Sequence, residues 1–190
     1  QDYTIIGEIV IIISVLTGLY GILNAAIHRD YKKMLAYCTI ENIGIIGISI
    51  GLGLMGMGNG NSLLIILGFT AALLHTLNHS LFKSLLFFNV GSVYQQTHTR
   101  DMEKLGGLIH RMPQTASLFL IGGLAIGGLP PFNGFVSKFI LYSGLLAGIK
   151  SIGTTYITLM ISSLAGLAII GGISMITFTK SFGTIFLGSP

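Results

Sequence analysis

Long apolar stretches separated by short polar segments run through the whole chain. A helix rises about 1.5 Å per residue, so about 20 apolar residues cross the roughly 30 Å hydrocarbon core of a bilayer. By that measure the pattern predicts five membrane spans in a single transmembrane unit, residues 1–190. The expected fold class is an all-α polytopic transmembrane helix bundle. The five predicted spans are residues 4–27, 34–54, 62–94, 114–148 and 154–179.

Two of these spans depart from a simple straight helix. Span 62–94 would be roughly 48 Å long as one helix, so it must tilt, bend or protrude from the bilayer. Span 114–148 contains Pro130-Pro131. Proline removes a backbone donor and clashes with the preceding turn, so we expect this span to be broken at that pair. Irregular backbone at membrane depth is tolerated only where protein or water satisfies its polar groups.

Three ionisable side chains, His75, His79 and Lys83, recur every four residues near the middle of span 62–94. Four residues advance about 400° around a helix, which places the three on one stripe. Ionisable groups inside a span are costly and usually face a protein interior or a water-filled path. Histidine titrates near neutral pH, and a buried lysine can release its proton when a neighbouring charge changes. The stripe therefore predicts a proton relay.

The same stripe has two other interpretations. The three side chains could be polar contacts between helices, with Lys83 extending toward the membrane surface. Two histidines four residues apart can also ligate zinc, but no Glu follows His75 as it does in the H-E-x-x-H motif. We expect no metal site and no catalytic residue in this chain.

Three further charged residues are candidates for the same path. Lys138 follows the proline pair, where a helix break would let backbone carbonyls and water reach it. The alternative is a kink that only fits the helices together. Glu41 lies about 12 Å into its span past Lys33, so it could pair with a lysine in the membrane or lie in the interfacial layer. Lys32 is most simply a charge that stops the preceding span.

Composition agrees with a membrane protein and argues against other classes. The chain is 52% hydrophobic and 8% charged, whereas soluble domains carry about 25% charged residues. The net charge of +4 comes from short loops rather than from one patch, so no nucleic-acid partner is expected. The single cysteine, Cys38, can form no internal disulfide. With no Cys cluster and no phosphate-binding Gly loop, we expect no cofactor in this chain.

Lysine and arginine are unevenly shared between the two ends of the predicted bundle. Cytoplasmic loops carry the excess of these residues. We therefore expect a protein of a bacterial or archaeal inner membrane, with Gln1 outside and Pro190 in the cytoplasm. The outer end receives Lys150 alone, and the cytoplasmic end receives Arg29, Lys32, Lys33, Arg100, Lys104, Arg111 and Lys180.

The chain also begins and ends like a piece of a larger subunit.

Several motifs together resemble the antiporter-like membrane subunits shared by respiratory complex I, Mrp-type cation/proton antiporters and membrane-bound hydrogenases. Two further stretches, Thr39 to Gly44 and Ser181 to Gly188, resemble the branch with hydrogenase-4 component B and the large membrane subunit of formate hydrogenlyase. The family motifs are Asp30-Tyr31-Lys32-Lys33-Met34-Leu35-Ala36-Tyr37, His75-x3-His79-x3-Lys83, Asp101-Met102-Glu103-Lys104-Leu105-Gly106-Gly107-Leu108 and Leu129-Pro130-Pro131-Phe132-Asn133-Gly134-Phe135-x2-Lys138.

The resemblance implies two inverted five-helix repeats, of which this chain would be the second. Lys83 would match the central lysine of the membrane axis, with His75 and His79 as the histidines beside it. Lys138 would match the ionisable residue of the second broken helix. Lys32 would match a lysine at the start of the preceding helix, and Glu41 a position specific to one branch.

The resemblance also implies a function. The expected protein is a proton-translocating, or Na⁺-translocating, membrane subunit of a redox-driven complex of the NADH:quinone oxidoreductase or hydrogenase/formate hydrogenlyase kind. Its partners would be other membrane subunits and the lipid bilayer. Iron–sulfur, Ni–Fe, flavin or quinone cofactors would belong to partner subunits. A cation/proton antiporter subunit without redox chemistry and a passive membrane anchor are the alternatives.

Overall fold

A computed structural model describes residues 2–151 and 156–188 of the chain. Helices make up most of both segments, and the described residues contain no strand beyond one isolated bridge. The predicted all-α fold is therefore confirmed. The elements in order are α1 (Asp2–Ile27), α2 (Tyr31–Gly58), α3 (Ser62–Thr97), the 3₁₀ turn η1 (Met102–Lys104), α4 (Pro113–Gly127), α5 (Asn133–Ser151), α6 (Ile157–Phe182) and the π-helical turn η3 (Gly183–Leu187).

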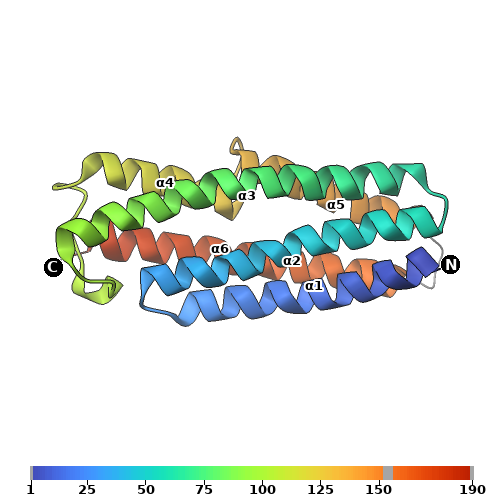
Figure 1. Cartoon of the computed structure of the whole chain (residues 1–190), viewed down its shortest axis with the longest axis horizontal. Coiled ribbons are helices and arrows are strands. Elements are labelled where there is room, and N and C mark those ends of the chain that lie inside the picture. Colours follow the sequence, from blue (N-terminus) through green and yellow to red (C-terminus); the bar gives the residue numbers. More distant parts are fainter. Residues whose placement is uncertain (1, 152–155, 189–190) are drawn as a thin grey trace.

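The long helices lie lengthwise beside one another and form an elongated bundle (Figure 1). Helices α4 and α5 follow one another along this length, and together they occupy the place of one long helix (Figure 1). Helix α4 has 15 residues, or about 22 Å of length, which is less than the roughly 30 Å of a hydrocarbon core. The predicted break at Pro130-Pro131 is confirmed, because residues 128–132 between the two helices are not helical.

Within the described residues, four helices are long and apolar enough to cross a membrane, judged by length and composition: α1, α2, α3 and the stretch Ile157–Leu187, in which η3 continues α6. Helix α2 begins and ends beyond the predicted span 34–54, and α3 continues past residue 94 to Thr97. The predicted span 154–179 starts at residues outside the described part of the chain. Residues Gln1 and Pro190 also lie outside it.

Side-chain caps explain where two of these helices begin. Asp30 precedes α2, and its Oδ1 accepts hydrogen bonds from the backbone N–H groups of Lys32 (2.8 Å) and Lys33 (3.1 Å). Asn61 precedes α3 and accepts in the same way from Leu63 and Leu64. Such caps satisfy N–H groups that the first turn of a helix leaves without a partner. The loops at these points are therefore tight.

Glycines allow α1 and α2 to pack backbone against backbone. A Cβ atom placed on Gly44 of α2 would lie 2.6 Å from the Cα of Gly18 in α1 and 2.7 Å from the carbonyl oxygen of Ser14. Gly51 of α2 similarly faces Gly7 of α1. Small residues at such crossings are typical of helices that associate in lipid. This close contact places α2 against the centre of the bundle.

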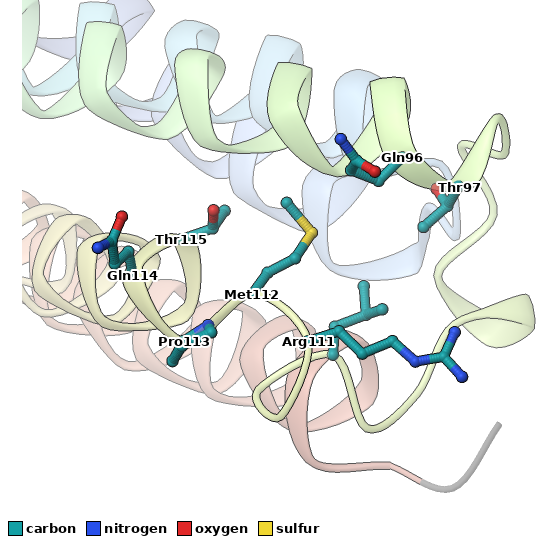
Figure 2. A pocket seen from close by; sticks show the side chains of 8 residues that line it. Gln96, Thr97, Arg111, Met112, Pro113, Gln114 and Thr115 are labelled. Carbon is teal, nitrogen blue, oxygen red and sulfur yellow. The ribbon is translucent and has the colours of Figure 1, made fainter.

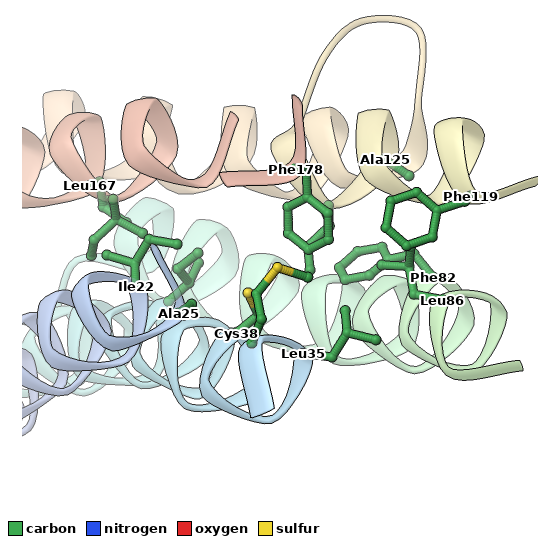
Figure 3. Packing of buried hydrophobic residues seen from close by; sticks show 14 of the residues in the cluster. Ile22, Ala25, Leu35, Cys38, Phe82, Leu86, Phe119, Ala125, Leu167 and Phe178 are labelled. Atoms are coloured by element: carbon green, nitrogen blue, oxygen red, sulfur yellow. The ribbon is translucent and has the colours of Figure 1, made fainter. Parts of the chain in front are cut away.

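The apolar core joins all the long helices (Figure 3). Large apolar side chains also cover the outside of the bundle. Several outward-facing residues of α1 and α3 are more than half exposed, among them Leu16 at 62% and Phe88 at 77%. An outer surface of this kind suits contact with lipid. Figure 3 labels core residues from five helices: Ile22, Ala25, Leu35, Cys38, Phe82, Leu86, Phe119, Ala125, Leu167 and Phe178.

The loop after α3 closes over the start of α2. Arg29 donates to Glu103 at 2.7 Å, and the hydroxyl of Tyr31 donates to the carbonyl oxygen of Thr99 at 2.8 Å. Backbone pairing between Asp30 and Asp101 completes the contact. Two sequence motifs that lie far apart in the chain therefore meet at one end of the bundle.

Candidate functional site

Lys83 projects from the middle of α3 into the bundle and is only 6% exposed. Its Nζ donates a hydrogen bond to the backbone carbonyl oxygen of Leu35 in α2. The ring of Phe87, one turn further along α3, lies 5.6 Å from Nζ. A charged ammonium needs such donor contacts and polar neighbours when it is kept from water. Lys83 therefore faces the protein interior rather than the outer surface.

His75 joins α3 to the two helices on either side of it. Its Nε2 lies 3.1 Å from Oδ1 of Asn42 in α2, and its Nδ1 lies 2.8 Å from Oγ of Ser137 in α5. Asn42 in turn donates from Nδ2 to the carbonyl oxygen of Cys38 at 2.7 Å. All of these side chains are buried. Three helices therefore share one chain of hydrogen bonds.

The chain of hydrogen bonds continues to the break between α4 and α5. Asn78 of α3 donates to Ser137 Oγ at 3.2 Å and to the carbonyl oxygen of Asn133 at 2.8 Å. Asn133 returns a hydrogen bond from Nδ2 to Oδ1 of Asn78 at 3.2 Å. Its own Oδ1 accepts from the N–H of Gly134 at 3.0 Å. These bonds tie the start of α5 to the middle of α3.

The last four carbonyl groups of a helix receive no hydrogen bond from within the helix, so the end of α4 needs other donors. The N–H of Gly128, a residue in the left-handed region at φ +79°, is one of these donors. Its N–H lies 3.2 Å from the carbonyl oxygen of Leu124 and 3.1 Å from that of Ala125. Glycine suits this position because a side chain would be strained there.

Lys138 provides further donors for the end of α4. Its Nζ donates to the carbonyl oxygen of Ile126 at 2.9 Å and lies 3.5 Å from that of Gly127. The ammonium group therefore caps the C-terminal end of α4, where the helix dipole favours positive charge. A Cβ on Gly128 would lie 2.9 Å from Cδ of Lys138, so glycine also leaves room for the lysine to pass.

A hollow of about 340 Å³ opens beside Lys138, between the helix break and α6. Tyr142 of α5 and the pair Gly171 and Gly172 of α6 contribute to its wall. Most of the side chains that line it are apolar or absent, so Lys138 is its only charged group among the described residues. Lys138 thus borders both the buried interior and this hollow.

Glu41 is completely buried in α2. Neither of its carboxylate oxygens has a hydrogen-bond partner within the described residues, although Ser174 of α6 and Cys38 lie beside it. Its charge interacts electrostatically with Lys138 and Lys83. The carboxylate therefore lies in the bundle interior, within electrostatic range of both lysines.

The other two predicted site residues are less closely joined to the network. His79 is partly exposed, its Nε2 has no partner within the described residues, and its ring meets Phe82 edge-on at 5.6 Å. Lys32 lies at the end of the bundle, with Nζ 4.5 Å from the ring centre of Tyr94. No hydrogen bond in the described segments connects Lys32 to the buried side chains.

The sequence did not single out the neutral members of the network: Asn42, Asn78, Asn133 and Ser137. A signal for two of them exists, because Asn42 follows Glu41 directly and Asn78 precedes His79 directly. A buried amide inside an apolar span costs free energy unless it is hydrogen-bonded. The position of each amide relative to His75 depends on how the helices pack, and the spacing along the chain does not contain that information.

A larger hollow than the one beside Lys138 lies away from these residues, at the end where α3 stops and α4 starts (Figure 2). It measures about 630 Å³, and Arg111 is its charged side chain. Gln96 and Thr97 face it from α3, and Gln114 and Thr115 face it from α4 (Figure 2). None of its lining residues takes part in the buried network, so it is separate from the candidate site.

Fold and site together define a class of protein: a polytopic helical membrane protein with ionisable side chains in its interior. A family model described as "NADH:quinone oxidoreductase/Mrp antiporter, TM" matches residues 1–166. The chain belongs to this family, and the resemblance predicted from its motifs is confirmed. Its place as the second of two repeats stays a prediction.

Individual relatives agree with the family. The chain is 39% identical to hydrogenase-4 component B and to formate hydrogenlyase subunit 3, both of Escherichia coli (strain K12), over 97% of its length in each case. It is 36% identical, over 93% of its length, to Na(+)/H(+) antiporter subunit A1 of Staphylococcus saprophyticus. It spans only 27%, 30% and 22% of these three relatives.

A solved structure shares the fold. A chain of the membrane-bound sulfane sulfur reductase, described as an archaeal respiratory membrane complex, superposes with a TM-score of 0.72 and 25% sequence identity. The match covers 95% of this chain and 33% of that one. The helix arrangement in Figure 1 is therefore one that occurs in a respiratory membrane assembly.

Proposed function

We propose that this chain is part of a proton-translocating membrane subunit of a redox-driven complex. The observation that carries the proposal is the burial of Lys83, Glu41 and Lys138 in the interior of one bundle. His75 lies in the same interior and is hydrogen-bonded to Asn42 and Ser137, the direct sequence neighbours of Glu41 and Lys138. Charged groups at that depth are costly, and a path for ions is the usual reason for keeping them. The relatives from hydrogenase-4 and formate hydrogenlyase support a redox complex of that kind.

Within this proposal each ionisable group has a role. Lys83 and His75 hold protons in the centre of the path, and Lys138 passes them toward the hollow at the helix break. Glu41 balances the charge of the two lysines, since it interacts electrostatically with both. His79 and Lys32 would act at the edges of the path. The electron chemistry, with iron–sulfur, Ni–Fe, flavin or quinone cofactors, would belong to partner subunits.

The proposed setting is an inner membrane, with other membrane subunits as neighbours. Helices α1 and α3 end, and α2 and α4 begin, at the end of the bundle that carries most of the lysines and arginines outside the spans (Figure 1). Cytoplasmic loops carry the excess of these residues, so this end would face the cytoplasm. Gln1 would then lie outside and Pro190 inside.

Replacing Lys83 tests the function directly. In the full-length subunit within its assembled complex, Lys83→Ala and the bulkier Lys83→Met should abolish proton transport driven by electron transfer. The measurement uses quenching of a pH-sensitive acridine dye in inverted membrane vesicles, with NADH, formate and hydrogen supplied one at a time. Lys33→Ala, which removes an exposed lysine at the start of α2, is the control and should pump normally.

Normal pumping by an assembled Lys83→Met complex would refute the proposal and favour a passive membrane anchor. The antiporter alternative is favoured by the 36% identity to Na(+)/H(+) antiporter subunit A1. In that case the same vesicles would move protons in response to added Na⁺ with no electron donor present, and Lys83→Ala would abolish that exchange instead.

A further inference from the structure

The amide of Asn42 determines which nitrogen of His75 carries a proton. Asn42 Nδ2 donates to the carbonyl oxygen of Cys38 at 2.7 Å. Turning the amide over would place two acceptor oxygens against each other, so Oδ1 must face His75. Oδ1 can only accept, and it lies 3.1 Å from Nε2. His75 therefore keeps a hydrogen on Nε2 whether it is neutral or charged.

Backbone groups determine the hydrogen positions at the other end of the network in the same way. The N–H of Gly134 donates to Oδ1 of Asn133 at 3.0 Å, so the Nδ2 of Asn133 faces Asn78 and donates to its Oδ1. The Nδ2 of Asn78 then donates to the carbonyl oxygen of Asn133 and to Ser137 Oγ. Ser137 Oγ accepts this bond in every state of the network.

The hydroxyl hydrogen of Ser137 is the one hydrogen of this network whose acceptor is not fixed by its neighbours. Two acceptors lie within its reach: Nδ1 of His75 at 2.8 Å and the carbonyl oxygen of Gly134 at 3.2 Å. When His75 is neutral, the hydroxyl donates to Nδ1. When His75 is charged, Nδ1–H donates to Oγ and the hydroxyl turns to Gly134. Both arrangements leave every donor in the network with an acceptor.

We propose that Ser137 is a positioning residue whose hydroxyl switches between Nδ1 of His75 and the carbonyl oxygen of Gly134, and so lets His75 bind and release a proton inside the membrane. The inference rests on the proposed function and adds to it the group that makes the protonation of His75 reversible. When a hydronium ion protonates Ser137 Oγ from the Gly134 side, the original hydroxyl hydrogen passes to Nδ1. The products are water, an unchanged serine and a charged His75, so protons and charge balance.

Neighbouring charges couple this step to the rest of the path. The ionisable groups that face His75 are Lys138 of α5 and His79 of α3, whereas α2 presents the neutral Asn42. A positive charge on His75 raises the cost of a positive charge on Lys138. Lys138 follows Ser137 directly in α5 and borders the hollow at the helix break. Protonation of His75 therefore favours proton release from Lys138 toward that hollow.

Three serine variants test the inference in the full-length subunit and assembled complex. Ser137→Ala removes the rotating hydroxyl and should lower the initial rate of proton transport by about tenfold or more, the equivalent of one unsatisfied buried donor. Ser137→Thr keeps a hydroxyl and should retain most of the rate. Ser163→Ala is the matched control, since both serines are 1% exposed and Ser163 Oγ, as far as the described residues go, donates only to Leu159 of its own helix, at 2.7 Å.

A second measurement separates proton binding from packing. Infrared difference spectra with ¹⁵N-labelled histidine should show protonation of His75 on changing pH in the wild type, in Ser137→Thr and in Ser163→Ala, and should lose it in Ser137→Ala. An unchanged rate and an unchanged histidine signal in Ser137→Ala would overturn the inference. Equal losses in Ser137→Ala and Ser137→Thr would also overturn it, because packing alone would then explain both.

The two proposals fail separately. If Lys83→Ala abolishes transport while Ser137→Ala leaves it intact, the role of Ser137 is wrong and the proposed function stands. If Lys83→Met complexes pump normally, the proposed function itself is wrong.

Discussion

Asn42 illustrates how a single neutral residue supports an ionisable one. Its Nδ2 satisfies the carbonyl oxygen of Cys38, and its Oδ1 accepts from His75. Asn42 carries no charge, yet its hydrogen bond to His75 fixes the tautomer of that histidine. Residues of this kind escape searches for charged groups within membrane spans, although they decide what the charged groups can do.

We expect Asn42→Leu to destabilise the bundle by about 1–3 kcal/mol, because it leaves Nε2–H of His75 as an unsatisfied buried donor. Thermal unfolding of the detergent-solubilised protein would measure the loss. Asn89→Leu is the matched control. Asn89 is also buried and also donates to a carbonyl oxygen of its own helix, at 2.8 Å, but within the described residues it forms no hydrogen bond to another helix. Equal losses for both variants would contradict the argument.

The charged members of the site follow from the sequence, because an ionisable residue in an apolar span is visible as a break in hydropathy. The sequence predicts Lys83, His75, Lys138 and Glu41 as candidates on that ground, and the structure buries all four in the bundle interior. Ser137 could not be found in this way. A serine in a span usually bonds to its own helix, and only the packing of α3 against α5 shows that this one faces His75.

At the scale of whole elements, the contact between α1 and α2 depends on glycine. The helices approach so closely at Gly18 and Gly44 that their backbones touch. Gly18 also lies against Ile170 of α6, since a Cβ there would lie 2.8 Å from its Cδ1. The crossing therefore sets the position of α2, and with it the positions of Glu41 and Asn42.

Gly44→Ala should accordingly destabilise the protein by about 1–3 kcal/mol, as expected for overpacking a tight contact. The same substitution at Gly91 of α3 is the control. A Cβ there would meet no atom within 4 Å, and alanine is the better helix former. We expect Gly91→Ala to unfold at the same temperature as the wild type or slightly above it. A Gly44→Ala variant as stable as Gly91→Ala would show that the backbone contact is looser than described.

Hydropathy and proline placement predicted the helices and the break, because both depend on local properties of the chain. The limits of α2 were less predictable. Its charged first turn, with Lys32 and Lys33, belongs to the helix because Asp30 caps it and the loop containing Asp101 covers it. Those contacts join segments about 70 residues apart, and a hydropathy pattern contains no information about them.

At the scale of the whole molecule, basic residues distinguish the two ends of the bundle. The turn between α2 and α3, residues 59–61, carries no charge, whereas the loop after α3 contains Arg100, Lys104 and Arg111. The membrane potential and the anionic inner leaflet favour the basic end on the cytoplasmic side. This asymmetry makes the orientation of the protein testable without any assay of transport.

Labelling of single cysteines introduced into the two loops would determine the orientation of the protein in the membrane. In a Cys38→Ser background, Asn59→Cys should react with a membrane-impermeant maleimide in spheroplasts. Lys104→Cys should react only in inverted vesicles, because its loop would face the cytoplasm. Both positions are exposed in the structure, so burial does not decide the result. The opposite pattern of labelling would reverse the proposed orientation.

The cap that Lys138 forms on α4 has a consequence for how a proton can leave it. The two carbonyl oxygens of Ile126 and Gly127 call for two N–H groups. A charged ammonium has three, and a neutral amine still has two. The helix end therefore keeps its hydrogen bonds after one proton departs. In the proposed proton path, the departing proton is the one that is transported, and the remaining two hold the end of α4 in place.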